Sequence, residues 1–162
     1  MSYLDFLVDA LAGVGMPAVG RGFTSSDIQA CWGDGFFDDE HKSGRMMRRD
    51  YGLVEFSFAR RGRADAWVCT GGVIQVHRLA RTADIVPQPV AERYGQFAAV
   101  VAFTVLLDAA QARGLALEPR PAPGANYDKF ETVGKRSCVY VMNASAPNSE
   151  GMRSGDVWSI QM

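Results

Sequence analysis

The chain has 162 residues, of which 48% are hydrophobic and 22% are charged, and its formal net charge is −1. This composition is typical of a globular protein and excludes a disordered chain, and the length suits a single domain over residues 1–162. Because the net charge is so small, no field over the whole molecule favours a nucleic acid or an anionic membrane as partner, and we expect neither.

Two short helices are predicted at the amino end. Apolar residues recur at helical spacing over residues 3–14 and glycines follow them, which indicates an amphipathic helix. Thr24 and Asp27 have the spacing of a capping box, and Gly33 is placed where a helix ends. The second helix is therefore predicted over about residues 25–32.

The amino end and the cysteines indicate a cytoplasmic protein. Residues 1–16 lack the basic segment of a signal peptide, and the longest apolar run, residues 97–107, is too short to span a bilayer. The three cysteines are odd in number and far apart, which favours buried reduced thiols over a disulfide framework. They are Cys31, Cys69 and Cys138.

The middle of the chain predicts strands. Residues 34–44 contain turn formers and charges and are expected to be a loop that leads into a first strand near Arg45. Residues 46–58, MMRRDYGLVEFSF, form the most patterned run of the chain. Val54, Phe56 and Phe58 alternate with their neighbours there, as in a half-buried second strand.

A glycine pair divides the next β-rich run. Residues 59–66 indicate a polar turn, and residues 67–79 are rich in β formers but contain Gly71-Gly72. These glycines either make a bulge in one long strand or form a two-residue hairpin turn, and we favour the bulge because a turn already precedes it.

The second half predicts one long helix followed by strands. Residues 90–113 carry apolar stripes over much of a helix and end at Gly114, and residues 118–126 are expected to be a proline-rich loop. Further strands are predicted over residues 127–133, 137–143 and 156–161, with a long loop over 145–155. The predicted fold is α+β: an antiparallel sheet of about five to six strands packed against this long helix, with two short N-terminal helices.

No catalytic, cofactor-binding or metal site is predicted. The sequence lacks the glycine motifs of nucleotide-binding proteins, the zinc-protease motif and the nucleophile elbow. His41 follows three acidic residues without the spacing of a calcium loop. Glu55 lies in an apolar strand, so we expect it to pair with a cation such as Arg48, Arg78 or His77.

A candidate partner-binding face lies in the acidic segment. Two aromatic residues among carboxylates suit an interface with an apolar centre and a charged rim. The alternative is that the two phenylalanines anchor a loop to the core. The candidate residues are Asp34, Phe36, Phe37, Asp38, Asp39 and Glu40.

Arginines also gather in this part of the sequence, and we expect a solvated face there. A patch that binds nucleic acid would need aromatic platforms between the arginines, and apart from Tyr51 these are missing. The arginines are Arg45, Arg48, Arg49, Arg60, Arg61 and Arg63.

Residues 20–80 resemble small proteins of bacteria, especially actinobacteria, that are uncharacterised or grouped with the immunity proteins of polymorphic toxin systems. The shared features are the spacing of Thr24, Asp27, Ile28 and Gly33, an acidic loop, RRDYGLVEFSF, a tryptophan and IQVHRL. In that group the tyrosine-glycine pair, here Tyr51 and Gly52, opens a core β-hairpin. The resemblance implies a non-enzymatic protein that neutralises a partner protein such as a cognate toxin.

Two other hypotheses belong to different classes of protein. One is a small-ligand binder or enzyme with a pocket between the long helix and the sheet, which uses Glu55 and His77. The other is a subunit that forms a homodimer through the edge of its sheet.

Overall fold

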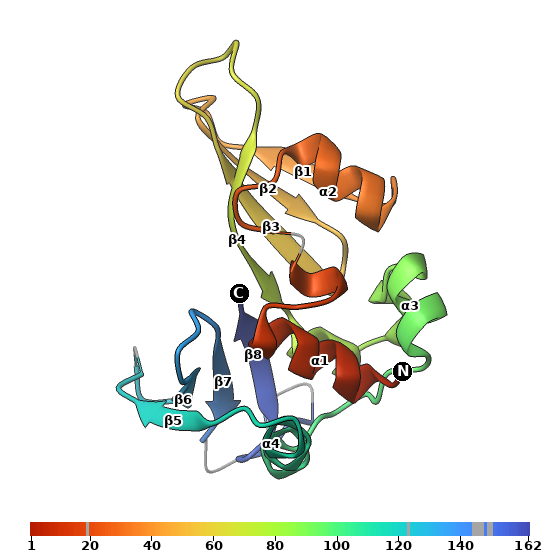
Figure 1. Cartoon of the computed structure of the whole chain (residues 1–162), viewed down its shortest axis with the longest axis vertical. Coiled ribbons are helices and arrows are strands. Elements are labelled where there is room, and N and C mark those ends of the chain that lie inside the picture. Colours follow the sequence, from red (N-terminus) through yellow and green to blue (C-terminus); the bar gives the residue numbers. More distant parts are fainter. Residues whose placement is uncertain (19, 123, 144–147, 149–150) are drawn as a thin grey trace.

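The computed structural model describes residues 1–18, 20–122, 124–143, 148 and 151–162. Over these residues eight strands form one antiparallel sheet in the order β1-β2-β3-β4-β8-β7-β6-β5 (Figure 1). The strands are β1 (Phe37–Glu40), β2 (Met46–Asp50), β3 (Val54–Ala59), β4 (Val68–Ile74), β5 (Leu117–Arg120), β6 (Tyr127–Thr132), β7 (Cys138–Met142) and β8 (Val157–Gln161). The α-helices are α1 (Tyr3–Ala12), α2 (Ser25–Trp32), α3 (Gln88–Tyr94) and α4 (Phe103–Ala112), and the 3₁₀ helices are η1 (Met16–Ala18), η2 (Val76–Ala80) and η3 (Ala83–Ile85).

The sheet consists of two four-stranded halves that meet at a narrow seam. Strands β1 to β4 follow one another in the first half, and β5 to β8 in the second. The halves are joined where β4 pairs with β8, in the register Val73 opposite Gln161 and Ile74 opposite Ile160. Figure 1 shows the first half above the seam and the second half below it, with α1 beside the seam.

The core lies between the sheet and the helices. In the first half, the ring of Trp32 on α2 meets the ring of Phe56 on β3 at 5.2 Å between centroids. Nearer the seam, Phe6 on α1 contacts Tyr94 on α3 at 5.2 Å. On β2, Met47 is buried whereas Met46 is exposed, so the other face of this half-sheet is open to solvent.

The two predicted N-terminal helices are confirmed, and both begin with a capping box. Thr24 Oγ1 accepts a hydrogen bond from the Asp27 backbone N–H, and the Asp27 carboxylate accepts one from the Thr24 N–H at 2.9 Å. Ser2 and Asp5 cap α1 in the same way. These hydrogen bonds stabilise the ionised carboxylates and lower the pKa of Asp5 and Asp27.

The predicted long helix over residues 90–113 is wrong. The chain forms α3 and α4 instead, because Gly95 adopts φ 75° and ψ −155° and ends α3. The segment that follows finds its backbone partners outside a helix. The Val101 carbonyl accepts a hydrogen bond from the Val157 N–H at 2.8 Å, and the Phe103 N–H donates to the Gly155 carbonyl at 2.8 Å.

The predicted fold of five to six strands against one long helix is therefore corrected to eight antiparallel strands with short helices. Two strands lie where the sequence predicts loops: β1 is within residues 34–44, and β5 begins at Leu117 and overlaps the predicted loop over 118–126. Both are edge strands. Charged side chains and a proline are tolerated at a sheet edge because one backbone side needs no partner.

The run MMRRDYGLVEFSF is not one strand but two, β2 and β3, joined by a turn at residues 51–53. Within β3, the predicted inward set of Val54, Phe56 and Phe58 is buried.

The bulge interpretation of the glycine pair is confirmed. Ser57 pairs with Gly71 and Phe58 with Cys69, so Thr70 is the extra residue on β4. The strand ends at Ile74, and His77 lies on η2 rather than on a strand.

The three strands predicted at the carboxyl end are confirmed as β6, β7 and β8, although the bounds differ by a residue at several ends. Of the loop predicted over 145–155, residues 145–147 and 149–150 lie outside the described residues. Among the described helices, none has both the length and the hydrophobicity needed to cross a bilayer.

Candidate functional site

The candidate partner-binding residues lie on β1 and the turn before it, but the two phenylalanines have different environments. Phe36 packs against the ring of Tyr51 at 5.4 Å between centroids, and the guanidinium of Arg49 lies 3.8 Å above its ring. Phe36 therefore anchors the segment to the core. Phe37 does not, since 71% of it is exposed.

Arginines of the neighbouring strands hold the carboxylates of β1. Arg49 binds Asp38 with two hydrogen bonds, Nε to Oδ1 at 2.7 Å and Nη2 to Oδ2 at 2.8 Å. Arg60 Nη2 pairs with Glu40 at 2.8 Å, and Arg48 Nη2 lies 3.4 Å from Asp39. The bond to Asp38 raises the pKa of Arg49 against the opposing effect of burial. The carboxylates of this edge are therefore paired with arginines rather than left as free negative charge.

A shallow hollow lies on the open face of the first half-sheet, beside Asp39 of β1. Its volume is about 510 Å³. Met46, which is 54% exposed, lines it together with Arg48 and Asp39, which form an ion pair. The open face of this half-sheet therefore exposes an apolar side chain beside an ion pair.

One backbone edge of β1 has no partner in the described part of the chain, since β1 ends the strand order. The His41 N–H donates to the Met46 carbonyl at 2.9 Å, and Asp39 is opposite Arg48 in the same register. Hydrogen-bonded pairs alternate in an antiparallel ladder, so the backbone groups of Asp39 point to β2. Those of Asp38 and Glu40 point away from the sheet and are available to another strand.

Glu55 and His77, the residues of the alternative pocket, have separate partners. Glu55 is paired with Arg78 and accepts a hydrogen bond from Gln75 Nε2 at 3.1 Å. The His77 ring stacks on Trp158, with 3.9 Å between centroids and an interplanar angle of 2°. Neither residue lines the hollow beside β1 or the pocket at the seam described below.

Asp9 forms a buried polar cluster that sequence reasoning did not single out. Tyr94 donates its hydroxyl to Asp9 Oδ2 at 2.9 Å, and Arg113 Nη1 lies 2.7 Å from Asp9 Oδ1. The cluster joins α1, α3 and the end of α4. A Cβ at Gly15 would lie 2.7 Å from Asp9 Oδ2, so glycine is needed beside it. Because both carboxylate oxygens of Asp9 are paired within the fold, we interpret the cluster as structural.

This cluster predicts a loss of stability at alkaline pH. Burial and the neighbouring Asp9 raise the pKa of Tyr94, so the folded state binds its proton more tightly than the unfolded state does. The stabilisation that this raised pKa provides is complete below the ordinary tyrosine pKa of about 10. It falls as the pH rises through the pKa of Tyr94 in the folded state. The free energy of unfolding, measured with denaturant at several alkaline pH values, should fall less steeply with pH in Tyr94→Phe than in the wild type. Equal slopes would contradict this assignment.

The described residues contain no group of three or more His, Cys, Asp or Glu side chains that could hold a metal ion. The expectation of three buried thiols holds for two. Cys69 and Cys138 are buried, and burial raises the pKa of each thiol, whereas Cys31 is exposed on α2.

A second pocket lies at the seam between the two half-sheets, and we call it the seam pocket. Its volume is about 170 Å³. Four segments that are far apart in the sequence line it. They are the end of α1 together with η1, the adjoining parts of β3 and β4, the turn between β6 and β7, and the end of the chain at Met162. No local motif marks such a site, because only the pairing of β4 with β8 brings these segments together.

The fold and these two sites define an antiparallel sheet with a free, ion-paired edge and a small pocket at its centre. No protein-family model, curated protein or solved structure matches the chain.

Proposed function

We propose that this chain is a non-enzymatic protein-binding protein of the immunity type, which neutralises one partner protein by holding an extended segment of it along β1. The observation that carries the proposal is the environment of Phe37, a large apolar side chain with 71% of it exposed, on a strand whose outer backbone edge has no partner within the described residues.

Backbone hydrogen bonds would supply the first part of the affinity. The amide and carbonyl groups of Asp38 and Glu40 point outward, so a partner strand can extend the sheet by pairing with them. Such an added strand gains main-chain hydrogen bonds without any change in the fold of this chain.

Phe37 would supply the apolar anchor. Aromatic residues at the centre of an interface often contribute 2 kcal/mol or more, which corresponds to about 30-fold in affinity. Two arginine-carboxylate pairs of this strand, Arg49–Asp38 at 2.7 Å and Arg60–Glu40 at 2.8 Å, are already formed in the free chain, so binding need not order these long side chains. A partner with an apolar pocket beside a free strand edge fits this surface.

The partner that we propose for the β1 edge is a different protein. A second copy of this chain, paired through β1, is the competing outcome. The small-ligand hypothesis for Glu55 and His77 stays a prediction.

The test is capture of the partner from the native host by tagged wild-type chain, followed by measurement of its affinity for the purified variants. Phe37→Asp should weaken binding by about 30-fold or more, because a charge would enter an apolar pocket. Glu40→Pro removes the outward amide and should also weaken binding by about tenfold. The matched control is Glu40→Ala, which loses the same ion pair with Arg60 but keeps the amide.

Equal affinities for Glu40→Pro and Glu40→Ala would contradict pairing at this edge. A dimer of this chain that dissociates on Phe37→Asp, with no other protein bound, would replace the proposed partner with a second copy. Where a partner is toxic to cells, co-expression of the wild-type chain should restore growth and Phe37→Asp should not.

A further inference from the structure

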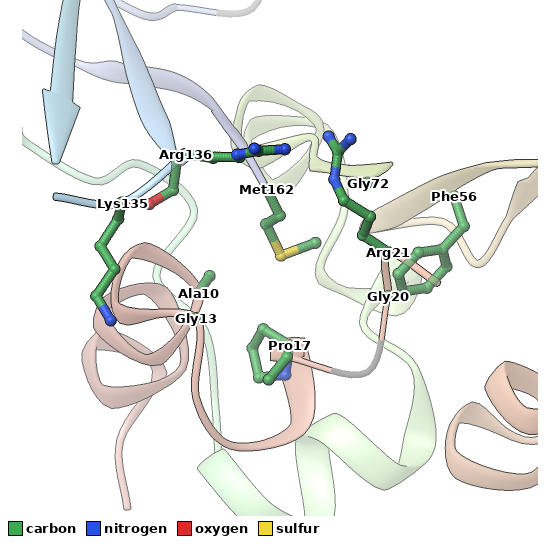
Figure 2. A pocket seen from close by; sticks show the side chains of 12 residues that line it. Ala10, Gly13, Pro17, Gly20, Arg21, Phe56, Gly72, Lys135, Arg136 and Met162 are labelled. Atoms are coloured by element: carbon green, nitrogen blue, oxygen red, sulfur yellow. The ribbon is translucent and has the colours of Figure 1, made fainter. Parts of the chain in front are cut away.

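The seam pocket combines an apolar interior with basic side chains at its rim. Ala10, Phe56 and Gly72 are buried and form part of its wall, and Figure 2 shows the Met162 side chain pointing in between Ala10 and Phe56. The same figure shows the side chains of Arg21 and Arg136 above Met162.

The rim cations have no counterion among the described residues. The side chains of Arg21, Lys135 and Arg136 make no ion pair or hydrogen bond there, whereas Arg49, Arg60, Arg78, Arg113 and Arg120 all have acidic partners. Arg21 lies against the backbone of β4, since a Cβ at Gly71 would be 3.5 Å from its Nη2. Two guanidinium groups above an apolar cavity favour a planar anion, which each can bind with two hydrogen bonds.

The volume limits the size of the ligand. A cavity of roughly 150 Å³ with apolar walls can hold one benzene molecule, and pockets for drug-sized ligands are about 300 Å³ or larger. The seam pocket, at about 170 Å³, therefore suits a single ring or a short branched chain.

Two glycines keep the space open. A Cβ at Gly72 would lie 2.9 Å from Met162 Cε and 3.1 Å from Phe56 Cδ1, so a side chain there would force both to move. A Cβ at Gly20 would lie 3.7 Å from Phe56 Cε1, an ordinary contact, and would point toward the pocket wall. A longer side chain at Gly20 would therefore extend into the cavity.

We propose that the seam pocket binds a small apolar carboxylate, with its ring or branched chain against Phe56 and Met162 and its carboxylate between Arg21 and Arg136. This site is separate from the β1 edge and does not depend on the proposed partner. Because the pocket is lined by both half-sheets, the bound ligand would hold them together at their narrow junction and raise the unfolding temperature.

The experiment compares three probes by NMR titration of the amides of Gly72, Arg136 and Met162. Benzoate has the ring and the charge, benzyl alcohol has the ring alone, and acetate has the charge alone. Benzoate should bind at least about tenfold more tightly than either of the other probes. Benzyl alcohol lacks the charge-assisted hydrogen bond of the carboxylate, and acetate lacks the buried ring. Its affinity should fall as salt is added.

Variants separate the two parts of the site. Gly20→Leu should abolish binding of both benzoate and benzyl alcohol, with Gly20→Ala as the matched control for the backbone. The double change Arg21→Gln and Arg136→Gln removes only exposed charges and should reduce benzoate affinity to that of benzyl alcohol. Arg61→Gln, which removes a charge from the β3–β4 turn, should change nothing.

Three results would overturn the proposal. The first is equal binding of benzoate and acetate, which would mean a surface anion site only. The second is binding of benzyl alcohol as tight as that of benzoate. The third is benzoate binding that is unchanged in Gly20→Leu. None of them would affect the test of the β1 edge.

Discussion

Phe56→Ala is expected to lower the free energy of unfolding by about 3–5 kcal/mol, the usual cost of removing a fully buried aromatic side chain. Phe56 is 0% exposed. Its ring meets Trp32 at 5.2 Å and Tyr51 at 6.1 Å between centroids, both edge to face. The alanine would leave a cavity between β3 and α2 that these rigid neighbours cannot fill, and it would also remove one wall of the seam pocket.

The matched control is Phe37→Ala, which removes the same side chain from the other face of the same half-sheet. Because Phe37 makes few contacts in the free chain, this change should alter stability by less than about 0.5 kcal/mol. Urea denaturation followed by tryptophan fluorescence measures both. Similar losses for the two variants would mean that the assignment of the two faces is wrong.

Gly52→Ala is expected to lower the free energy of unfolding by several kcal/mol, even though it adds a single methyl group. Gly52 has φ 85°, which costs about 1–2 kcal/mol for a residue with a side chain. A Cβ there would also lie 2.6 Å from the Ile85 carbonyl oxygen, and this atom belongs to the backbone. The same carbonyl accepts a hydrogen bond from the Leu53 N–H at 2.9 Å, so it cannot move away without loss of that bond.

Gly22→Ala separates the two causes. Gly22 has φ 88°, but a Cβ there would meet no atom within 4 Å. This variant should therefore lose only the roughly 1–2 kcal/mol of backbone strain. Thermal unfolding of the two proteins measures the difference, and an equal loss in both would show that the contact with Ile85 is unimportant.

The elements that sequence could predict are those whose local signals agree with their tertiary environment. The capping box of Thr24 and Asp27 gave α2, and the alternation of Val54, Phe56 and Phe58 gave β3. From residues 46–58 the sequence predicts a single strand that includes Tyr51 and Gly52, on the alternation of residues 53–58. What makes these two residues part of a turn is a glycine held against Ile85, a residue that is distant in sequence.

Other elements could not be predicted because their causes lie elsewhere in the chain. Residues 96–102 carry the apolar spacing of a helix, yet the carbonyl of Val101 binds the backbone of Val157. Similarly, Phe37 and its acidic neighbours read as a loop, since an edge strand can be charged and exposed on both faces. The seam pocket exists only because β4 and β8 meet, and no stretch of sequence contains that information.

The central claim is that β1 is the surface that receives a partner strand. Amide hydrogen exchange, measured residue by residue on the free chain and on its complex with the captured partner, tests this most directly. Slower exchange of the Asp38 and Glu40 amides in the complex, with the buried amides of β3 unchanged, is the predicted result. Unaltered exchange at both positions, together with protection on another surface of the molecule, would contradict the claim.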